Sequence, residues 1–363
     1  MSEHKRFLNT GQKLLKTMRS TSHRSRKGGG VFGDRWNPPK TSDGAEPQGV
    51  VLFPGEYKIP VSIGKRGKEQ RELDLPYYVA FEHYYATKRR GAPCSAGISL
   101  ISDGPDSELT WGNGQCPACY HIDDGVGGIS RRLVHVFNAV LLGHFHLIDS
   151  DRVDASNKPY KDWTECEGKR CKYCSSGSDR VYGRRVYWQL GTRFVNTLTT
   201  HAQTVLSKRC KCGGEITPIG FQCEACGDVI RDLDAHPASR EEIATIRRTS
   251  AACPHCGVVD VPEEVPECDS CKKAQPLTLW DVQLHVARQG EGTDTTLMIS
   301  EWKPISDKLL ARVESRMKPY NFAETLFKPQ TPAQQAKRLG IPDPYTDATT
   351  RSDVGGVDWD GDE

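Results

Sequence analysis

The sequence has no run of about 18 apolar residues, the length that a membrane-spanning helix needs. Its first residues, MSEHKRFLNTGQKLLK, lack the continuous apolar stretch of a secretory signal. We therefore expect no membrane partner and no export, and cysteines that stay reduced rather than form disulfides. The H-E-x-x-H and P-loop motifs are also missing, so no sharp catalytic signature points to an enzyme.

Cysteine, in contrast, is abundant. The chain has 14 cysteines in 363 residues, and ten of them stand in C-x-x-C pairs, a spacing typical of zinc sites. Two four-cysteine patterns are the clearest: Cys210, Cys212, Cys223 and Cys226 form the first, and Cys253, Cys256, Cys268 and Cys271 the second. Chain order predicts that each pattern closes a tetrahedron around one structural zinc, which supplies the folding free energy of a small ribbon.

Two further sets use the remaining six cysteines. Cys116-x-x-Cys119 needs two more ligands, and His83 and Cys94 upstream are the candidates for a His-Cys-Cys-Cys site. With the two ribbons and a fourth site, the cysteines predict up to four zinc ions per chain.

The fourth site has no obvious final ligand. It contains the trio Cys166, Cys171 and Cys174, and the sequence leaves His144, His146, a carboxylate or a crossover from Cys119 open as the fourth donor. An incomplete set is also where a catalytic zinc could keep a position for water. A zinc-dependent nuclease or a primase-like enzyme would then use His144, His146, Asp149, Asp151 and Asp154.

Charge is distributed unevenly along the chain. Residues 1–40 carry ten Lys or Arg against two acids, while the last 21 residues, from Asp343, carry seven acids against Arg351 alone. The net charge of +2 hides this polarity. A basic head and an acidic tail are typical of interaction segments.

Strand-like text dominates between the two ends. Short β-rich runs begin at Gly49, and the longest is Arg131–Ile148; helical spacing occurs at 193–206, and Ser306 caps an expected helix to Met317. This pattern predicts a mainly β fold with some helix (α+β), built as a five-stranded barrel with insertions. We expect a basic flexible arm at 1–48, a core at 49–320 with insertions near 95–115 and 150–180 and zinc ribbons at 208–272, and a linker and acidic tail at 321–363.

Aromatic and basic side chains interleave in three places in this core. Such mixtures suit single-stranded nucleic acid, because arginine and lysine contact phosphates while aromatic rings stack on bases. On the strand from Arg131, alternation predicts one face toward a core and one toward a ligand. The candidate DNA-binding residues are Tyr78, Tyr84, Tyr85, Lys88, Arg89, Arg90, Arg131, Arg132, His135, Phe137, Arg184, Arg185, Tyr187 and Trp188.

The order His83, Cys94, Cys116-Pro117-Ala118-Cys119 resembles the single-stranded DNA-binding (helix-destabilising) proteins of T-even-like bacteriophages. The segments VVLFP, LPYYVAFEHYY, CSAG, SRRLVHVFNAVLL and VYWQLGTRFVNTLTTHA are similar to that family's strands and ligand segments, and 280–302 to its closing hairpin. The likeness covers roughly residues 48–310. It departs in the longer Cys94–Cys116 gap, the inserted cysteine elements and the short acidic tail.

The resemblance implies an OB-fold around a structural zinc, and cooperative, sequence-independent binding of single-stranded DNA in viral replication, recombination and repair, without catalysis. It implies binding to further copies through the head, at Lys5, Arg6, Arg19, Ser20 and Thr21, and recruitment of replication and recombination proteins by the acidic tail. The expected location is the cytoplasm of an infected bacterial host.

Two alternatives belong to other classes. One is the zinc-dependent nucleic-acid enzyme that would use the Cys166 trio. The other is a zinc-ribbon transcription factor, which the two ribbons alone permit but which leaves the strands and the His83–Cys119 order unexplained.

Overall fold

The computed structural model describes residues 34–41, 44–63, 69–88, 90–100, 109–112, 114–153, 159–222, 229–231, 263–290 and 295–346. These residues are mainly β with short helices, as the sequence predicts. The chain divides into two compact units, one made of the residues up to Thr199 together with those from Gln283, and one from Thr200 to Val282. In the part of the chain described, no helix is long and apolar enough to cross a membrane.

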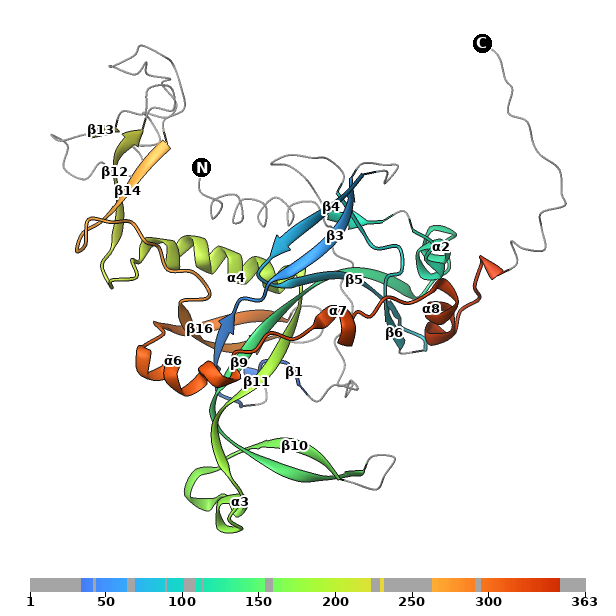
Figure 1. The fold of residues 1–363 in the computed structure, drawn as a ribbon, viewed down its shortest axis with the longest axis horizontal. Coiled ribbons are helices and arrows are strands. Elements are labelled where there is room, and N and C mark those ends of the chain that lie inside the picture. Colours follow the sequence, from blue (N-terminus) through green and yellow to red (C-terminus); the bar gives the residue numbers. More distant parts are fainter. Residues whose placement is uncertain are drawn as a thin grey trace. The chain divides into compact units, whose positions relative to one another are not determined.

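The first unit is built on a nine-stranded sheet (Figure 1). Its strands are β1 (Arg35–Trp36), β2 (Gln48–Phe53), β5 (Tyr78–Tyr85), β6 (Arg90–Pro93), β9 (Ile129–Val153), β10 (Pro159–Glu165), β11 (Arg180–Gly191), β15 (Val282–Gln289) and β16 (Thr296–Pro304). The expected hairpin at 280–302 is present as β15 and β16.

Strand β9 is the spine of this sheet and is 25 residues long. One of its edges pairs with β11, and the other pairs in turn with β5, β2 and β10. Alternating Val134, Val136 and Val140 favour the extended backbone and are buried. Gly183, with φ +82°, forms a bulge in β11 between Tyr182 and Arg184, where β9 bends toward the β10 hairpin (Figure 1).

A four-stranded sheet packs on the nine-stranded one. It contains β4 (Glu69–Leu75), β3 (Tyr57–Ile63), β7 (Ile98–Leu100) and β8 (Leu109–Trp111), in that order. Ile59, Val61 and Leu100 from this sheet form one core cluster with Phe81 and Leu133 of the larger sheet. The first unit therefore buries β5 and β9 on the face that carries Phe81 and Leu133.

The second unit holds a three-stranded sheet, β13 (Val229–Arg231), β12 (Ile216–Gln222) and β14 (Glu263–Cys268). Strand β12 pairs antiparallel with β14 so that Ile216 lies opposite Cys268. This register brings Cys268, at the end of β14, next to the start of β12, and so determines which cysteines of this unit lie close together.

The helices are short: α2 (Pro117–Asp123), α3 (Lys172–Ser175), α4 (Thr192–Thr204), α6 (Asp307–Val313), α7 (Phe322–Thr325) and α8 (Pro332–Leu339). Ser306 caps α6 by accepting the Leu309 N–H at 3.3 Å, as the sequence predicts. A capping box of Thr331 and Gln334 starts α8, and Gly340, with φ +69°, ends it. Residues 318–345, which include α7 and α8, run along the first unit and are called the C-terminal strap below.

Candidate metal centres and the basic-aromatic face

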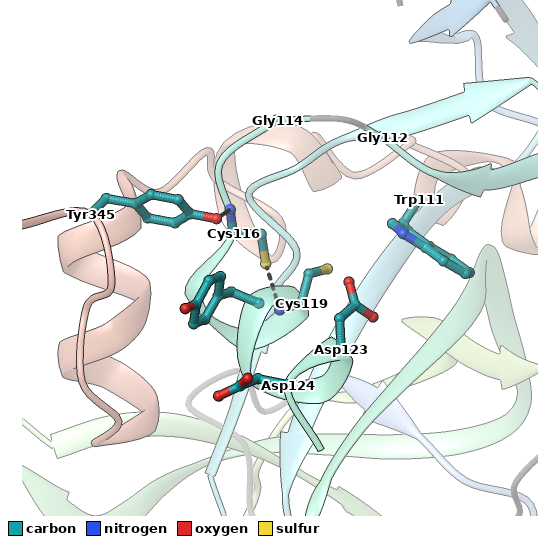
Figure 2. Close-up of a pocket in the computed structure, with 9 residues that line it drawn as sticks. Trp111, Gly112, Gly114, Cys116, Cys119, Asp123, Asp124 and Tyr345 are labelled. Atoms are coloured by element: carbon teal, nitrogen blue, oxygen red, sulfur yellow. Dashed lines mark hydrogen bonds between the residues drawn. The ribbon is translucent and has the colours of Figure 1, made fainter. Parts of the chain in front are cut away.

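The His83 centre brings together His83, Cys94, Cys116 and Cys119, the set that the sequence predicts; their ligand atoms lie within 4.8 Å of one another. His83 comes from β5 and Cys94 directly follows β6. Cys116 caps helix α2, accepting the Cys119 N–H at 3.4 Å (Figure 2). Pro117 fits the first turn because its missing N–H has no helical partner there.

The spacing of these atoms is that of a tetrahedral site. Cys94 Sγ lies 3.7 Å from the sulfurs of both Cys116 and Cys119, and the two sulfurs of α2 lie 3.3 and 3.5 Å from His83 Nε2. A zinc ion with metal–sulfur bonds of about 2.3 Å would give sulfur–sulfur edges of about 3.8 Å and sulfur–nitrogen edges of about 3.6 Å. The donors are thus already arranged around one ion-sized position.

The protons of the three thiols are coupled. Hydrogen bonds with Cys119 and Cys94 hold the pKa of Cys116 below the ordinary thiol value, whereas the hydrogen bond with Cys116 raises the pKa of Cys119 to about 12. Without a metal the site therefore favours one thiolate among neutral thiols. A bound metal would take up all three as thiolates and release the remaining protons.

Groups around the His83 centre hold its cysteines in place. Gln335 of α8 is completely buried; its side-chain oxygen accepts the Ala118 N–H at 3.4 Å and its Nε2 donates to the Pro93 carbonyl at 2.7 Å, so it joins the backbone beside Cys119 to the backbone beside Cys94. Arg131 donates from Nη1 to Cys119 Sγ at 3.3 Å, and Tyr345 accepts the Cys116 N–H through its hydroxyl at 3.3 Å. Such outer contacts orient ligands and tune the metal.

The His146 centre resolves the open fourth ligand of the cysteine trio. His146 of β9 joins Cys166, Cys171 and Cys174 within 4.8 Å, with His146 Nε2 3.3 Å from Cys174 Sγ and Cys166 Sγ 3.6 Å from Cys174 Sγ. His144, a carboxylate and Cys119 are not part of this set. The hairpin explains the choice, because β10 pairs Thr164 with His146 and delivers Cys166 beside it.

The tautomer of His146 suits metal binding. Ser178 donates its hydroxyl hydrogen to the Tyr173 carbonyl at 2.9 Å, so its oxygen is free to accept the His146 Nδ1–H, also at 2.9 Å. The Asp179 carbonyl lies 3.2 Å from the same Nδ1. With the proton on Nδ1, Nε2 keeps its lone pair on the side of the three cysteine sulfurs, where it can bind a metal.

The Cys210 centre corrects the pairing expected from chain order. Cys210 and Cys212 meet Cys268 and Cys271, with Cys210–Cys271 and Cys212–Cys268 sulfur distances of 3.7 and 3.4 Å. The β12–β14 register causes this closure, because it places the first and last cysteine pairs of the unit side by side. Cys223, Cys226, Cys253 and Cys256 lie outside the described residues.

Four of the candidate DNA-binding side chains are core residues. His135, Phe137, Tyr187 and Trp188 are at most 4% exposed, so they offer no ring face to a base. The expectation that the Arg131 face of β9 points to a ligand is wrong, because that face packs under Tyr77, whose ring stacks on Phe137. Burial without compensation lowers the pKa of His135 to about 4.

Other candidates are committed to protein contacts. Arg131 lies 3.3 Å from the Trp111 ring centroid and against the Cys119 sulfur. Tyr78 stacks on Phe327 at 5.3 Å, and Arg185 lies 3.7 Å over the Tyr320 ring. In these last two cases the C-terminal strap covers the side chain that the sequence assigns to DNA.

The remaining candidates are more accessible. Lys88 and Arg90 are exposed, as is Arg132, while Tyr84, Tyr85 and Arg184 are half-buried. Lys88 donates to the Gly340 carbonyl of the strap and lies 5.4 Å from the Tyr85 ring centroid. Arg89 lies outside the described residues, as do the head residues Lys5, Arg6, Arg19, Ser20 and Thr21.

The strap supplies the functional residues that sequence reasoning missed. The Tyr320 backbone carbonyl accepts a hydrogen bond from the Tyr57 hydroxyl at 3.0 Å, and the Tyr320 N–H donates to the Asn138 side-chain oxygen at 3.0 Å. Phe322 is buried against the same sheet. The sequence did contain a signal for Gln335. This residue lies on the buried side of α8 with Ala336 and Leu339, and because a buried amide needs hydrogen-bond partners, its position predicts a polar contact with another element.

No protein-family model, curated protein or solved structure matches this chain.

Proposed function

We propose that this chain binds single-stranded DNA without sequence preference, through one face of the nine-stranded sheet. The observation that carries the proposal is a row of arginines beside an aromatic ring. Pairing of Glu82 with Arg132, and of Tyr84 with Ser130, puts Tyr84 and Arg132 on the same face of β5 and β9. This combination is what a sequence-independent single-strand site needs.

Arg35 extends the row onto β1. It pairs with Tyr187 of β11, and its pKa is lowered by burial first and by the nearby Arg132 charge, although Glu82 opposes both. Arg132 is held by Glu82 at 2.7 Å, with Gln189 donating to the same carboxylate at 2.9 Å. One Glu82 carboxylate faces two guanidinium groups, so the pair keeps a net positive charge to which a DNA phosphate can bind.

The metal centres fit a structural role in this proposal. Each of the three described centres offers four protein ligands of the sulfur and nitrogen type that zinc prefers, which leaves no position for a catalytic water. We therefore favour a binding protein over the zinc-dependent enzyme. The remaining four cysteines, two C-x-x-C pairs, would hold a fourth zinc.

The rest of the proposal follows the sequence. The core would contain an OB-fold barrel, the basic head would contact the next copy along DNA, and the acidic tail would recruit replication and recombination proteins in an infected bacterium. The separation of charge between the two ends and the order of the His83 ligands support these assignments.

A titration of short single-stranded and duplex DNA tests the proposal. We expect a preference for single strands, a loss of about tenfold for Tyr84→Leu, since one stacked base contributes about 1–3 kcal/mol, and a shallower salt dependence for Arg132→Gln. Lys58→Gln is the matched control, because Lys58 is an exposed lysine on the other sheet, 3.9 Å from Glu72.

Two results would contradict this function. Duplex DNA that binds as tightly as single strands would favour a zinc-ribbon transcription factor. Cleavage or nucleotide incorporation in the presence of magnesium would show an enzyme instead.

A further inference from the structure

A pocket of about 480 Å³ opens beside the His83 centre, away from the Tyr84–Arg132 face. Figure 2 shows Trp111 and Tyr345 on opposite sides of it, with Cys116, Cys119 and Asp123 between them. Its volume is in the range of small-ligand sites. The lining combines aromatic rings, carboxylates and the sulfurs of the metal centre.

Exposed aromatic side chains stand in this largely polar pocket. Among the described residues, five large hydrophobic side chains are exposed, and two of them line the pocket: Trp111 at 39% and Tyr120 at 48%. A third, Val126, follows α2 by three residues. Exposed tryptophan and tyrosine around a concavity are typical of surfaces that bind another polypeptide.

The residues that line the pocket carry a net negative charge, which favours a cationic ligand. With a divalent metal bound, the three thiolates of the His83 centre exceed its charge by one. Asp123 and Asp124 add two carboxylates, against the single guanidinium of Arg131, which lies 3.7 Å from Asp123. A negative pocket repels phosphate, so nucleic acid is not its ligand.

The chain already shows how a guanidinium fits here. Arg131 lies 3.3 Å from the Trp111 ring centroid and donates to the Cys119 sulfur, so one cation uses the aromatic ring, the thiolate and the carboxylate together. Cation–π contact favours arginine over a neutral side chain. Asp124, Tyr120 and Tyr345 extend the same chemistry to the open side of the pocket.

We propose that this pocket is a docking site for an arginine side chain presented by a partner polypeptide. The arginine would lie between the aromatic rim and Asp124, beside the negative His83 centre. The site would thus recognise a protein partner while the opposite chemistry of the Tyr84–Arg132 face recognises phosphate.

A matched pair of peptides tests this site on the zinc-loaded full chain. The probes are the pentapeptide Gly-Ser-Arg-Ser-Gly with blocked ends and the same peptide with citrulline, the neutral isostere of arginine. The readout is the indole N–H signal of Trp111 in a protein labelled at tryptophan, assigned with Trp111→Phe. We expect a saturable shift with the arginine peptide and affinity at least fivefold weaker with the citrulline peptide.

Two variants locate the binding. Asp124→Asn should weaken the arginine peptide at least threefold, whereas Asp149→Asn, an exposed acid on the β9–β10 hairpin paired with Lys161, should leave it unchanged. Zinc content, measured on each variant, should stay at the wild-type value. Equal binding of the two peptides, or equal effects of the two variants, would overturn the proposal.

Deleting residues 1–33 separates two sources of the arginine. Unchanged peptide affinity supports a partner polypeptide. A tenfold gain would mean that the basic head of the chain fills the pocket, and would overturn the partner assignment. None of these outcomes depends on DNA binding, which the Tyr84→Leu titration measures separately.

Discussion

The His83 and His146 centres use the same donors, one histidine and three cysteines, in different surroundings. Both histidines are fully buried on the main sheet, and at the His83 centre Ala92, Ala118 and Leu339 also form a core cluster with the cysteines. The His146 centre lies at the β9–β10 hairpin with α3, and its Cys174 is exposed. The first centre joins β5, β6, α2 and α8 of the first unit, whereas the second fastens one hairpin.

Their histidines differ as well. His146 Nδ1 has the Ser178 hydroxyl at 2.9 Å, whereas His83 Nδ1 is buried without a hydrogen-bond partner among the described residues. At the His83 centre the outer support goes to the cysteines instead: Arg131 donates to the Cys119 sulfur, and Gln335 bonds the backbone at Pro93 and Ala118. The comparison teaches that identical ligands can be oriented from the histidine side or from the sulfur side.

Removing one ligand from each centre gives the largest expected difference. Cys116→Ser should lose one zinc and destabilise the first unit by on the order of 5 kcal/mol or more, because the metal contributes folding free energy to the elements that it joins. Cys174→Ser should also lose one zinc but lower the melting temperature much less. Native mass spectrometry and calorimetry on the two variants measure both effects. Equal losses of stability would break the comparison.

Chain order was enough for the His83 centre and failed for the Cys210 centre. Cys116 and Cys119 are fixed by one helical turn, and His83 and Cys94 lie on the paired strands β5 and β6, so local geometry closes the site. Cys210 and Cys268 are far apart in sequence, and they are brought together by the β12–β14 register and by the bridge between Cys210 and Pro276. Register between distant strands is a tertiary property that spacing does not encode.

A third histidine sharpens the comparison, because it is buried with no metal near it. His135 of β9 is 3% exposed, and neither ring nitrogen has a hydrogen-bond partner among the described residues. Desolvation lowers its pKa from 6.5 to about 4. Above pH 6.5 the histidine is neutral in both the folded and the unfolded chain. Between pH 6.5 and about 4 the unfolded chain binds the proton and the folded chain does not, so the free energy of unfolding decreases as the pH is lowered.

We expect this histidine to cost about 3 kcal/mol of stability at pH 4, from about 1.4 kcal/mol per pKa unit. His135→Leu should therefore be less sensitive to acid than the parent protein. Because the metal ligands also take up protons in this range, the measured quantity is the difference in unfolding free energy between the two proteins at each pH. A difference that stays constant from pH 7 to pH 4 would contradict the buried, neutral His135.

The basic-aromatic prediction shows the limit of alternation along a strand. It separates the two faces of β9 correctly, but it assumes that one of them meets solvent. His135 and Phe137 meet Tyr77, and Val134 and Val136 meet the C-terminal strap through Phe322 and Phe327. A strap that follows almost 200 residues later in the chain leaves no local signal in the strand that it covers.

The smallest expected effect tests the two modes of outer support. Gln335→Met keeps the volume of the side chain but removes the amide that joins the Pro93 carbonyl, next to Cys94, to the Ala118 N–H, next to Cys119; it should lower the zinc affinity of the His83 centre roughly tenfold. Ser178→Ala is the counterpart at the His146 centre and should act there alone, because Ser178 contacts only that histidine of the two. Its effect should be smaller than about tenfold, since Asp179 still offers its carbonyl to Nδ1 at 3.2 Å. Competition with a chelator, followed by zinc release from each centre, measures both. If Gln335→Met left the zinc affinity of the His83 centre unchanged while Ser178→Ala weakened that of the His146 centre, the contacts around the cysteines would not contribute to zinc binding at the His83 centre.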